Sequence, residues 1–275
     1  MRSGGIWRLL APERAPRYER FIHEYDVVRQ GEGRGCEDPA YYRGLPFHDA
    51  TGRHSADWRI RARSFETFVR RVLVPLEQDR RPPLSALDLG AGSGWLAARL
   101  AARGHHVGAV DLRDDAMDGL GALPRYEPRV VPIQAEFDRL PFEDGQIDLA
   151  VFNASFHYAE RFEATLAEAL RVLRVRGRVV LLDTPIYRRA ASGARMVEER
   201  HAHFERAYGT RSDALDSENF LTYRRLEQLG TAFGLAWVRT RPFYGLRWAL
   251  RPWKARLLGR REPAQFMIVV GEKVS

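Results

Sequence analysis

The chain has 275 residues, 45% of them hydrophobic, which is enough to bury a substantial core in one large domain or in a domain with a lid. Its net charge of +8 comes from arginines scattered among 36 acidic residues, so we do not expect nucleic acid as a partner. The single cysteine, Cys36, excludes an internal disulfide and a cysteine-rich metal site. Because we find no signal peptide and no run of about 18 apolar residues, we expect a soluble cytoplasmic protein; membrane contact is left open but is not expected.

Residues 1–79 precede the first clear strand, and we expect them to form a cover or lid segment. Residues 1–54 are rich in Gly, Arg and Tyr, which predicts irregular structure with short helices. From Ser55 to Gln78 the apolar side chains approach helical spacing and predict one long helix. The sequence RRPP at 80–83 ends that helix.

Strands and helices alternate through the middle of the chain. The sequence predicts strands at 85–90, 106–111, 129–136, 147–153 and 178–183, and helices at 95–103, 112–123 and 161–173. The strands are apolar almost throughout, rather than at every second residue. This pattern is typical of a parallel sheet that is covered by helices on both faces.

The pattern loosens after Asp183. Helices are expected at 192–208 and 220–233, and the final strands at 236–242 and 264–273. No crossover helix is predicted between the final strands, so they can pair antiparallel. The predicted fold is therefore α/β: a Rossmann-like, doubly wound, seven-stranded, mostly parallel sheet with an antiparallel last strand and an N-terminal helical cover. Its main domain spans 80–275, with insertions at 184–215 and 242–261.

A glycine-rich turn follows the first central strand, where residues 87–94 read LDLGAGSG. The dinucleotide-binding pattern G-x-G-x-x-G also stands between a strand and a helix, but Trp95 occupies its third glycine position. That position needs a small residue for close packing of helix on strand. Asp88 also places a carboxylate near the helix N-terminus, where a dinucleotide puts its anionic pyrophosphate. The glycine turn is therefore poorly suited to a nicotinamide dinucleotide, which argues against a nicotinamide-dependent oxidoreductase.

Asp111 ends the second central strand, at the place where this architecture holds ribose hydroxyls. A glycine turn, an acid for a ribose and a carboxylate in place of a pyrophosphate site together indicate a nucleoside that carries a positive group. S-adenosylmethionine has this chemistry, because its sulfonium and its ammonium are both cationic. The residues therefore point to this cofactor.

Four segments resemble the successive motifs of class I S-adenosylmethionine-dependent methyltransferases, in particular the small-molecule group that includes quinone-biosynthesis methyltransferases. They are LDLGAGSG (87–94), VDL (110–112), AEFDRLPFEDGQIDLAVFNASFHY (135–158) and LRVLRVRGRVVLLD (170–183). The resemblance covers residues 84–183 well and the later helix and strands more loosely. It implies S-adenosyl-L-methionine as the cofactor and says little about the acceptor.

The resemblance also implies which residues hold the methionine end of the cofactor. Gly90, Ala91 and Gly92 would lie against the methionine moiety, and Asp88 would lie near its amino group. Asn153, at the end of the fourth central strand, would contact the methionine portion through its backbone or side chain.

The nucleoside end is assigned in the same way. Asp111 would hold the ribose hydroxyls, and Leu112 would pack on the adenine. Glu136 would accept a hydrogen bond from the adenine amino group, and Phe137 would offer its backbone N–H to the ring. The alternatives are that Asp111 and Glu136 are exposed strand-end acids, and that Leu112 and Phe137 only pack in the core.

Candidate catalytic residues follow the fourth strand. His157 could act as a general base if the acceptor keeps its proton, and Tyr158 could shape the pocket or donate a hydrogen bond. The alternative is an aromatic pair that covers the sheet edge. Asp183, Thr184 and Tyr187 follow the fifth strand at the same edge and are predicted to line the acceptor site.

No metal site is expected. In HAHF (201–204) the two histidines are two residues apart, so they do not share a helix face, and no carboxylate completes a site. A solvated helix face explains this stretch better.

The segment 242–261 combines aromatic side chains with arginines. Phe243, Tyr244, Trp248 and Trp253 stand among five arginines and Lys254. We interpret it as an amphipathic insertion packed on the sheet edge, with arginines that extend to solvent. A lid over the acceptor, a clamp for an anionic substrate and a lipid-contacting surface are alternatives.

The sequence as a whole predicts a methyltransferase that acts on an oxygen, carbon or nitrogen atom of a small molecule. Nucleic-acid methylation fits less well, because NASF (153–156) stands where base-amino methyltransferases carry [DN]PP[YF]. An RNA methyltransferase and a non-catalytic, S-adenosylmethionine-binding regulatory subunit remain alternatives. The oligomeric state is not predicted.

Overall fold

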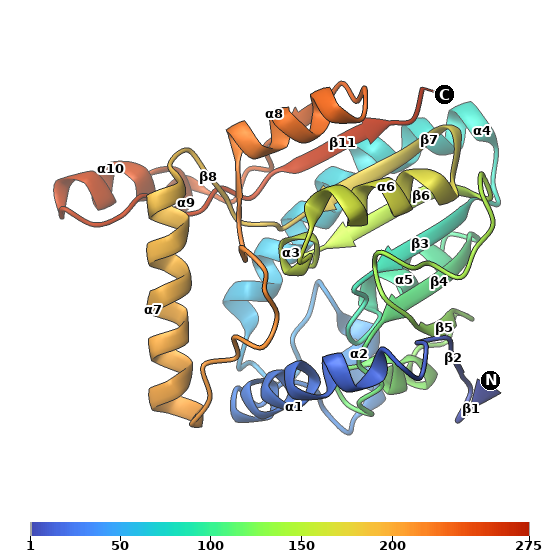
Figure 1. Ribbon diagram of the computed structural model, residues 1–275, viewed down its shortest axis with the longest axis horizontal. Helices are drawn as coiled ribbons and strands as arrows, with labels where there is room; N and C mark the ends of the chain where they lie inside the picture. The colour runs from blue at the N-terminus through green and yellow to red at the C-terminus, as the bar shows by residue number, and fades with distance from the viewer. Residues whose placement is uncertain (1, 275) are drawn as a thin grey trace.

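Nine strands form one sheet in the computed structural model, which describes residues 2–274 (Figure 1). The strand order is β1-β2-β5-β4-β3-β6-β7-β11-β10. The five central strands run parallel: β3 (Ser85–Leu89), β4 (His106–Asp111), β5 (Val131–Gln134), β6 (Ile147–Asn153) and β7 (Leu173–Leu182). The predicted mostly parallel α/β sheet is confirmed.

The two ends of the sheet differ. At one end β11 (Ile268–Glu272) lies antiparallel between β7 and β10 (Val238–Thr240), so the predicted antiparallel last strand is confirmed. At the other end β1 (Arg2–Ser3) pairs with β2 (Ile6–Arg8), and β2 adds in parallel to β5. The expected number of seven strands is therefore wrong. Strands this short show no alternating pattern in a sequence, and the open edge of β5 holds them in place.

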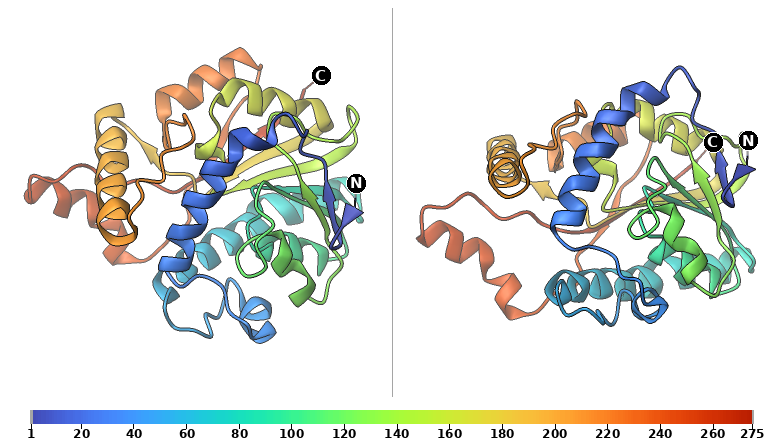
Figure 2. Two further views of the ribbon diagram at one scale, coloured as in Figure 1. Left: turned by 60° about the horizontal axis from the view of Figure 1, so that its bottom comes forward. Right: turned by 90° about the horizontal axis from the view of Figure 1, so that it is seen from below.

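Helices cover both faces of the sheet (Figures 1 and 2). One face carries α3 (Ser55–Phe68), the π-helical turn η1 (Val69–Leu73), α4 (Val74–Arg80) and α5 (Trp95–Ala101). The other carries α6 (Phe162–Val172) and α8 (Tyr223–Ala232). In β6, Leu149 and Val151 enter the first core and Ala150 and Phe152 the second. The strand is apolar throughout because both of its faces are buried.

The N-terminal region contains more regular structure than the sequence predicts. A 17-residue helix, α1 (Ala15–Gly31), and the short α2 (Pro39–Gly44) lie in the part expected to be irregular. In the left view of Figure 2, α1 crosses in front of the sheet. Its sequence is rich in charged residues, so this helix depends on the tertiary contacts described below.

The remaining elements are α7 (Ala190–Tyr208), a small parallel sheet of β8 (Ile186–Tyr187) and β9 (Leu221–Thr222), and two short helices, α9 (Leu246–Ala249) and α10 (Arg251–Leu257). A short 3-10 turn, η3 (Phe156–Tyr158), follows β6. Within residues 2–274, no helix has both the length and the apolar character needed to cross a membrane.

The helix predicted at 112–123 does not form. Turns and the 3-10 helix η2 (Leu120–Arg125) connect β4 to β5 instead. The Asp115 carboxylate accepts hydrogen bonds from the backbone N–H groups of Met117 and Asp118, at 2.9 and 2.7 Å, and so stabilises a turn in place of a helix. A Cβ on Gly119 would lie 2.6 Å from the Asp115 nitrogen, so only glycine permits this close approach.

Trp95 provides a test of the core between α3 and α5. Its indole is buried and meets Trp58 and Phe65 edge-on, with ring centroids 6.1 and 5.7 Å apart. Trp95→Ala should lower the free energy of unfolding by about 3–5 kcal/mol, measured by urea denaturation. The control Val238→Ala changes an exposed residue and should alter it by less than about 0.5 kcal/mol. Equal effects of the two changes would contradict this packing.

Candidate active site

A cleft opens where β3, β4 and β6 end, with about 860 Å³ of space that is partly open to solvent. Gly90 and Gly92 of the glycine turn, Asp111 after β4 and Ser155 after β6 are among the residues that line it. The strand order reverses between β3 and β6, so the cleft lies at the switch point where open α/β sheets bind ligands. The fold therefore brings together the ends of segments that are far apart in the sequence.

The glycine turn lies close against its neighbours. Gly90, Gly92 and Gly94 have φ values of +76°, +53° and +79°, a region that side chains other than glycine rarely adopt. A Cβ on Gly90 would overlap the Ser155 side chain. The backbone N–H groups of Gly90 and Ala91 both donate to the carbonyl of Val110, at 2.8 and 3.1 Å. These contacts fix the turn against the end of β4.

Asp111 connects this turn to the next loop. Its Oδ2 accepts a hydrogen bond from the Gly92 N–H at 2.7 Å, and its Oδ1 accepts one from the Arg113 N–H at 2.9 Å. Burial raises the pKa of Asp111, although Arg113 opposes the shift. Each carboxylate oxygen keeps a further lone pair, so this side chain can accept hydrogen bonds from a pair of ribose hydroxyls in the cleft.

Glu136 lines the same cleft, and α1 holds its carboxylate. Arg14 Nε donates to Oε1 at 2.8 Å, and the Tyr18 hydroxyl donates to Oε2 at 2.8 Å. Burial opposes the charge of Glu136, but these hydrogen bonds keep its pKa below the usual value. Phe137 and Leu112 also line the cleft, and Phe137 packs edge-on against Phe152 of the core.

Aromatic side chains of α1 form one wall of the cleft. Tyr18, Phe21 and Tyr25 project from the same side of the helix. Phe21 and Tyr25 contact Tyr158, with ring centroids 6.4 and 5.8 Å away. The predicted residue Tyr158 therefore belongs to the cleft wall.

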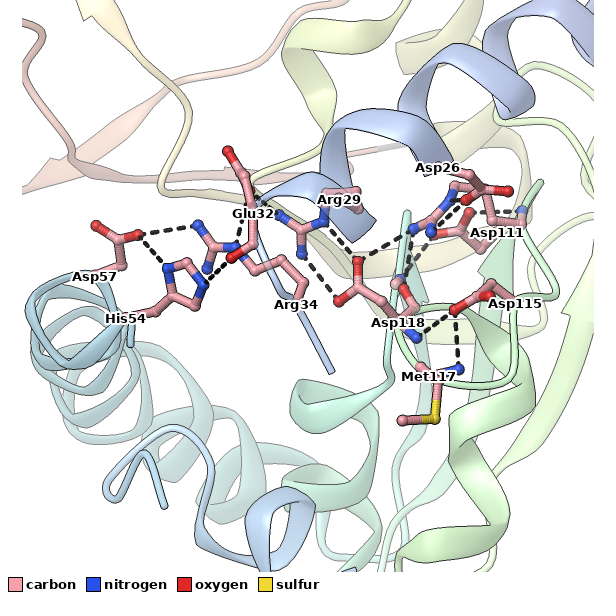
Figure 3. A network of polar contacts seen from close by, with 12 residues as sticks. Asp26, Arg29, Glu32, Arg34, His54, Asp57, Asp111, Asp115, Met117 and Asp118 are labelled. Carbon is pink, nitrogen blue, oxygen red and sulfur yellow. Dashed lines mark hydrogen bonds and ion pairs between the residues drawn. The ribbon is translucent and has the colours of Figure 1, made fainter. Parts of the chain in front are cut away.

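A network of charged groups joins α1 to the loop after β4 (Figure 3). Arg29 donates two hydrogen bonds to the Asp118 carboxylate, at 2.6 and 3.0 Å. Arg113 contacts Asp118 as well, and its Nε donates to Asp26 of α1 at 2.7 Å. Burial opposes the charge of Asp118, but the two arginines hold its pKa below the usual value. Because the N–H of Arg113 also binds Asp111, the network reaches the floor of the cleft.

The network continues away from the cleft toward α3. Arg34 pairs with Glu32 at 2.9 Å and with Asp57 at 3.1 Å, and the ring of His54 lies 3.0 Å from the Glu32 carbonyl (Figure 3). This connection fixes the C-terminal end of α1 against the start of α3.

Three predicted cofactor residues lie behind the cleft lining. Asp88 is fully buried, and its Oδ2 accepts a hydrogen bond from the Ala97 N–H in the first turn of α5, at 3.1 Å. Burial raises the pKa of Asp88 to about 7. Ala91 and Asn153 are also buried, and Asn153 Oδ1 has no hydrogen-bond partner among the described residues.

Further buried polar groups meet the ends of β6 and β7. His157 Nδ1, Asp183 Oδ2 and Thr184 Oγ1 have no hydrogen-bond partner in the described part of the chain. The Ser64 hydroxyl donates to Asp183 Oδ1, and the Tyr244 hydroxyl lies 2.8 Å from Ser64 Oγ. Ala154 lines the cleft, and its N–H donates to the carbonyl of Leu182, the last residue of β7, at 2.8 Å. The polar groups at the end of β7 therefore lie beside the cleft lining.

The pKa values of His157 and Asp183 differ from those in water. Burial, together with Arg200 and Arg61, lowers the pKa of His157 to about 3, so its ring is neutral at pH 7. Burial raises the pKa of Asp183 to about 6, against the opposing effects of Arg61 and Ser64. Asp183 is therefore a carboxylate at neutral pH with an ionisation close to the working range of a general base.

Tyr187 lies in the small sheet beside α7. Its ring packs edge-on against Phe220, with centroids 5.8 Å apart, and its hydroxyl accepts a hydrogen bond from Arg261 at 3.5 Å. It is not among the residues that line the cleft.

The sequence analysis missed several lining residues. They are Tyr18, Phe21, Tyr25 and Arg29 of α1, Arg113 and Asp118 after β4, and Ser155 after β6. The spacing of Tyr18, Phe21 and Tyr25, three and then four residues apart, is a helical stripe that could have been recognised. Among residues 2–274 no cluster of three or more metal-ligating side chains occurs.

Comparison with known proteins identifies the domain. Residues 87–181 match a family described as a methyltransferase domain. Residues 87–181 therefore form a methyltransferase domain. The methyltransferase domain thus spans the glycine turn, the end of β4 and the segment that leads to β7, and the family predicted from the sequence is confirmed.

Characterised relatives share the same region. Malonyl-[acyl-carrier protein] O-methyltransferase of Geobacter sulfurreducens is 35% identical over 131 residues, which is 46% of this chain and 48% of the relative. Demethylmenaquinone methyltransferase of Clavibacter sepedonicus is 31% identical over 113 residues, covering 41% and 44%. The chain therefore spans about half the length of the curated relatives it matches.

A solved structure shows the same fold over most of the chain. The 1,6-didemethyltoxoflavin-N1-methyltransferase of Burkholderia thailandensis superimposes with a TM-score of 0.52 at 18% sequence identity. The match covers 92% of this chain and 91% of that one. The methyltransferase fold therefore extends beyond the residues that the family comparison matches.

Arg29→Met tests the charged network around the cleft. The change leaves Asp118 buried without its bidentate partner, so the free energy of unfolding should fall by about 3 kcal/mol in urea denaturation at pH 7. The control Arg63→Met removes an exposed ion pair with Glu66 and should cost less than about 0.5 kcal/mol. If the two variants lose equal stability, the buried network does not hold α1.

Asp183→Asn tests the ionisation of the buried carboxyl. Folding raises its pKa from 3.8 to about 6, so the folded state holds the proton more tightly. The wild type therefore loses stability as the pH rises from about 4 to about 6. Asparagine cannot ionise, so the variant's unfolding free energy relative to wild type should increase by on the order of 2–3 kcal/mol across this window.

Urea titrations at several pH values measure this difference. Asp144→Asn changes an exposed carboxylate and should show no comparable trend. A difference between Asp183→Asn and wild type that does not vary with pH would contradict the assigned ionisation.

Proposed function

We propose that this protein transfers the methyl group of S-adenosylmethionine to an oxygen, carbon or nitrogen atom of a small-molecule acceptor. The observation that carries the proposal is the Asp111 carboxylate, which lies in the cleft and is held by the N–H of the glycine turn. An acid at this position suits ribose hydroxyls. The methyltransferase domain found by comparison supports the same cofactor.

The charges and shapes of the cleft fit this cofactor. Gly92 lines the cleft and has no side chain, so a ligand can approach its backbone closely. Asp88 already occupies an N–H of the first turn of α5, which disfavours a pyrophosphate there. Tyr18, Phe21 and Tyr25 provide aromatic rings, which are favourable neighbours for a cation and for an adenine.

Each end of the cofactor has its own residues. Gly90, Ala91 and Gly92 hold the methionine moiety, with Asp88 and Asn153 behind them. When bound, S-adenosylmethionine supplies an electrophilic methyl group on its sulfonium.

At the nucleoside end, Asp111 accepts hydrogen bonds from the ribose hydroxyls and Glu136 accepts one from the adenine amino group. Arg14 and Tyr18 fix the orientation of Glu136. Leu112 and Phe137 pack on the ring. These contacts orient the cofactor before the acceptor binds.

The acceptor side lies at the ends of β6 and β7. Asn153, His157, Asp183 and Thr184 each have a buried polar atom without a partner among the described residues, which an acceptor molecule can satisfy. Asp183 is better suited than His157 to take a proton from the acceptor, because its pKa of about 6 is closer to neutral pH. The neutral His157 ring accepts a hydrogen bond, and Tyr158 forms the wall beside it.

The acceptor is a small molecule with a polar reacting group. The relatives described above are named as an O-methyltransferase of malonyl-[acyl-carrier protein] and as a demethylmenaquinone methyltransferase, so their names cover different kinds of acceptor. A catalytically inactive, cofactor-binding subunit would retain the same cleft, so turnover separates the two functions. An RNA methyltransferase is the less favoured alternative.

Calorimetry with S-adenosylhomocysteine tests the cofactor assignment. Asp111→Asn loses the charged acceptor for the ribose and should bind the ligand roughly 10- to 150-fold more weakly than wild type. Asp144→Asn also removes one carboxylate, but far from the cleft lining, and should leave the affinity unchanged. Unchanged affinity in Asp111→Asn, or binding of NADH instead, would contradict the assignment.

Turnover of S-adenosylmethionine against phenols, quinols and carboxylic acids tests the activity itself. Methylated product with at least one class supports the enzyme. Tight binding of S-adenosylhomocysteine without product from any class would favour the regulatory subunit.

A further inference from the structure

Residues 241–261, which we call the arm, connect β10 to β11 and contain α9 and α10. The arm extends away from the body of the molecule in every view (Figures 1 and 2). No side chain of α9 or α10 is fully buried. None of the arm's residues is among those that line the cleft.

One side of the arm packs against the protein. Trp248 stacks near Phe266, with ring centroids 5.7 Å apart, and near Tyr244 at 5.0 Å. The Arg251 guanidinium lies 3.7 Å from the centre of the Trp248 ring. These contacts fix which face of the helices is turned toward the body.

The opposite side presents an apolar stripe to solvent. Leu246 lies in α9, Leu250 lies between the two helices, and Trp253 and Leu257 lie four residues apart on one face of α10. They are 74%, 60%, 68% and 84% exposed. At about 100° per residue, Trp248 is about 200° from Leu246 in α9, and Arg251 is about 200° from Trp253 in α10, so both point away from the exposed apolar residues. Such a stripe normally packs against a core, and here it packs against nothing in the described chain.

The arm is also strongly basic. It holds seven arginine or lysine residues and no acidic residue, whereas the whole chain carries a net charge of +8. In α10, Lys254 and Arg256 lie on the two sides of the apolar face, and in α9 Arg247 follows Leu246. Within residues 2–274, no acidic side chain forms an ion pair with Arg247, Lys254, Arg256 or Arg260. These charges are free to meet an anionic surface.

We propose that the arm docks the protein onto a lipid surface that carries anionic headgroups. An exposed stripe of Leu and Trp flanked by basic residues is the pattern of a helix that lies in the membrane interface, with its apolar face among the acyl chains. Self-association through the arm would bring two strongly basic segments together, and a nucleic acid would leave the apolar stripe uncovered. The sequence analysis did not expect membrane contact but kept a lipid-contacting surface as an alternative for 242–261, and the exposure of the stripe is the observation that favours it.

Cosedimentation with vesicles tests the proposal. The full chain should bind phosphatidylcholine vesicles in which one quarter of the lipid is phosphatidylglycerol, but not phosphatidylcholine alone. Leu250→Ser/Trp253→Ser should weaken binding on the order of a hundredfold, because two apolar anchors are lost. Arg247→Gln/Lys254→Gln should weaken it roughly 25-fold, and added salt should weaken the wild type.

Matched controls separate this surface from general attraction to a basic protein. Arg70→Gln/Arg71→Gln removes the same charge from the exposed turn η1, and Val175→Ser removes an exposed apolar side chain from β7; both should bind like the wild type. Equal loss in these controls, or no binding of wild type to the anionic vesicles, would overturn the proposal. A wild-type dimer that becomes monomeric in Leu250→Ser/Trp253→Ser, without vesicle binding, would assign the stripe to a second copy of the chain and also overturn it.

Discussion

The hydrogen bond from the Gly92 N–H to the Asp111 carboxylate is the contact on which the rest of the site depends. It joins the glycine turn to the end of the neighbouring strand, so that backbone and carboxylate face the same cleft. The turn is possible because its glycines adopt positive φ, and it is kept in place by the Val110 carbonyl. The other contacts on this side of the cleft continue from this pair, beginning with the Arg113 N–H that donates to Asp111.

Ion pairs connect the site at the edge of the sheet to the N-terminal helix α1. Arg113 binds Asp111 through its backbone and Asp118 through its side chain, and Arg29 of α1 closes the other side of Asp118. In the same way, Arg14 at the start of α1 forms an ion pair with Glu136. A helix with little apolar character is thus held across a cleft by buried ion pairs, which specify its position through geometry more than they add to stability. The same helix supplies the aromatic wall.

The acceptor side and the arm are linked through α3. The Tyr244 hydroxyl, at the base of the arm, lies beside Ser64 Oγ, and Ser64 donates to Asp183. The arm therefore begins next to the carboxyl proposed to take a proton from the acceptor. If the arm docks on a lipid surface, the acceptor side is anchored near that surface, an arrangement suited to acceptors that partition into membranes.

The sequence by itself determined the parallel sheet, the methyltransferase family and many of the residues that line the cleft. Those features depend on local patterns: apolar strands, glycines at fixed spacing and acids at strand ends. Only the tertiary structure decided the rest. It placed α1 over the cleft, turned 112–123 into a loop around Asp115, added β2 to the edge of β5 and left the arm's apolar stripe in solvent. Each of these depends on partners distant in the chain, which local patterns do not contain.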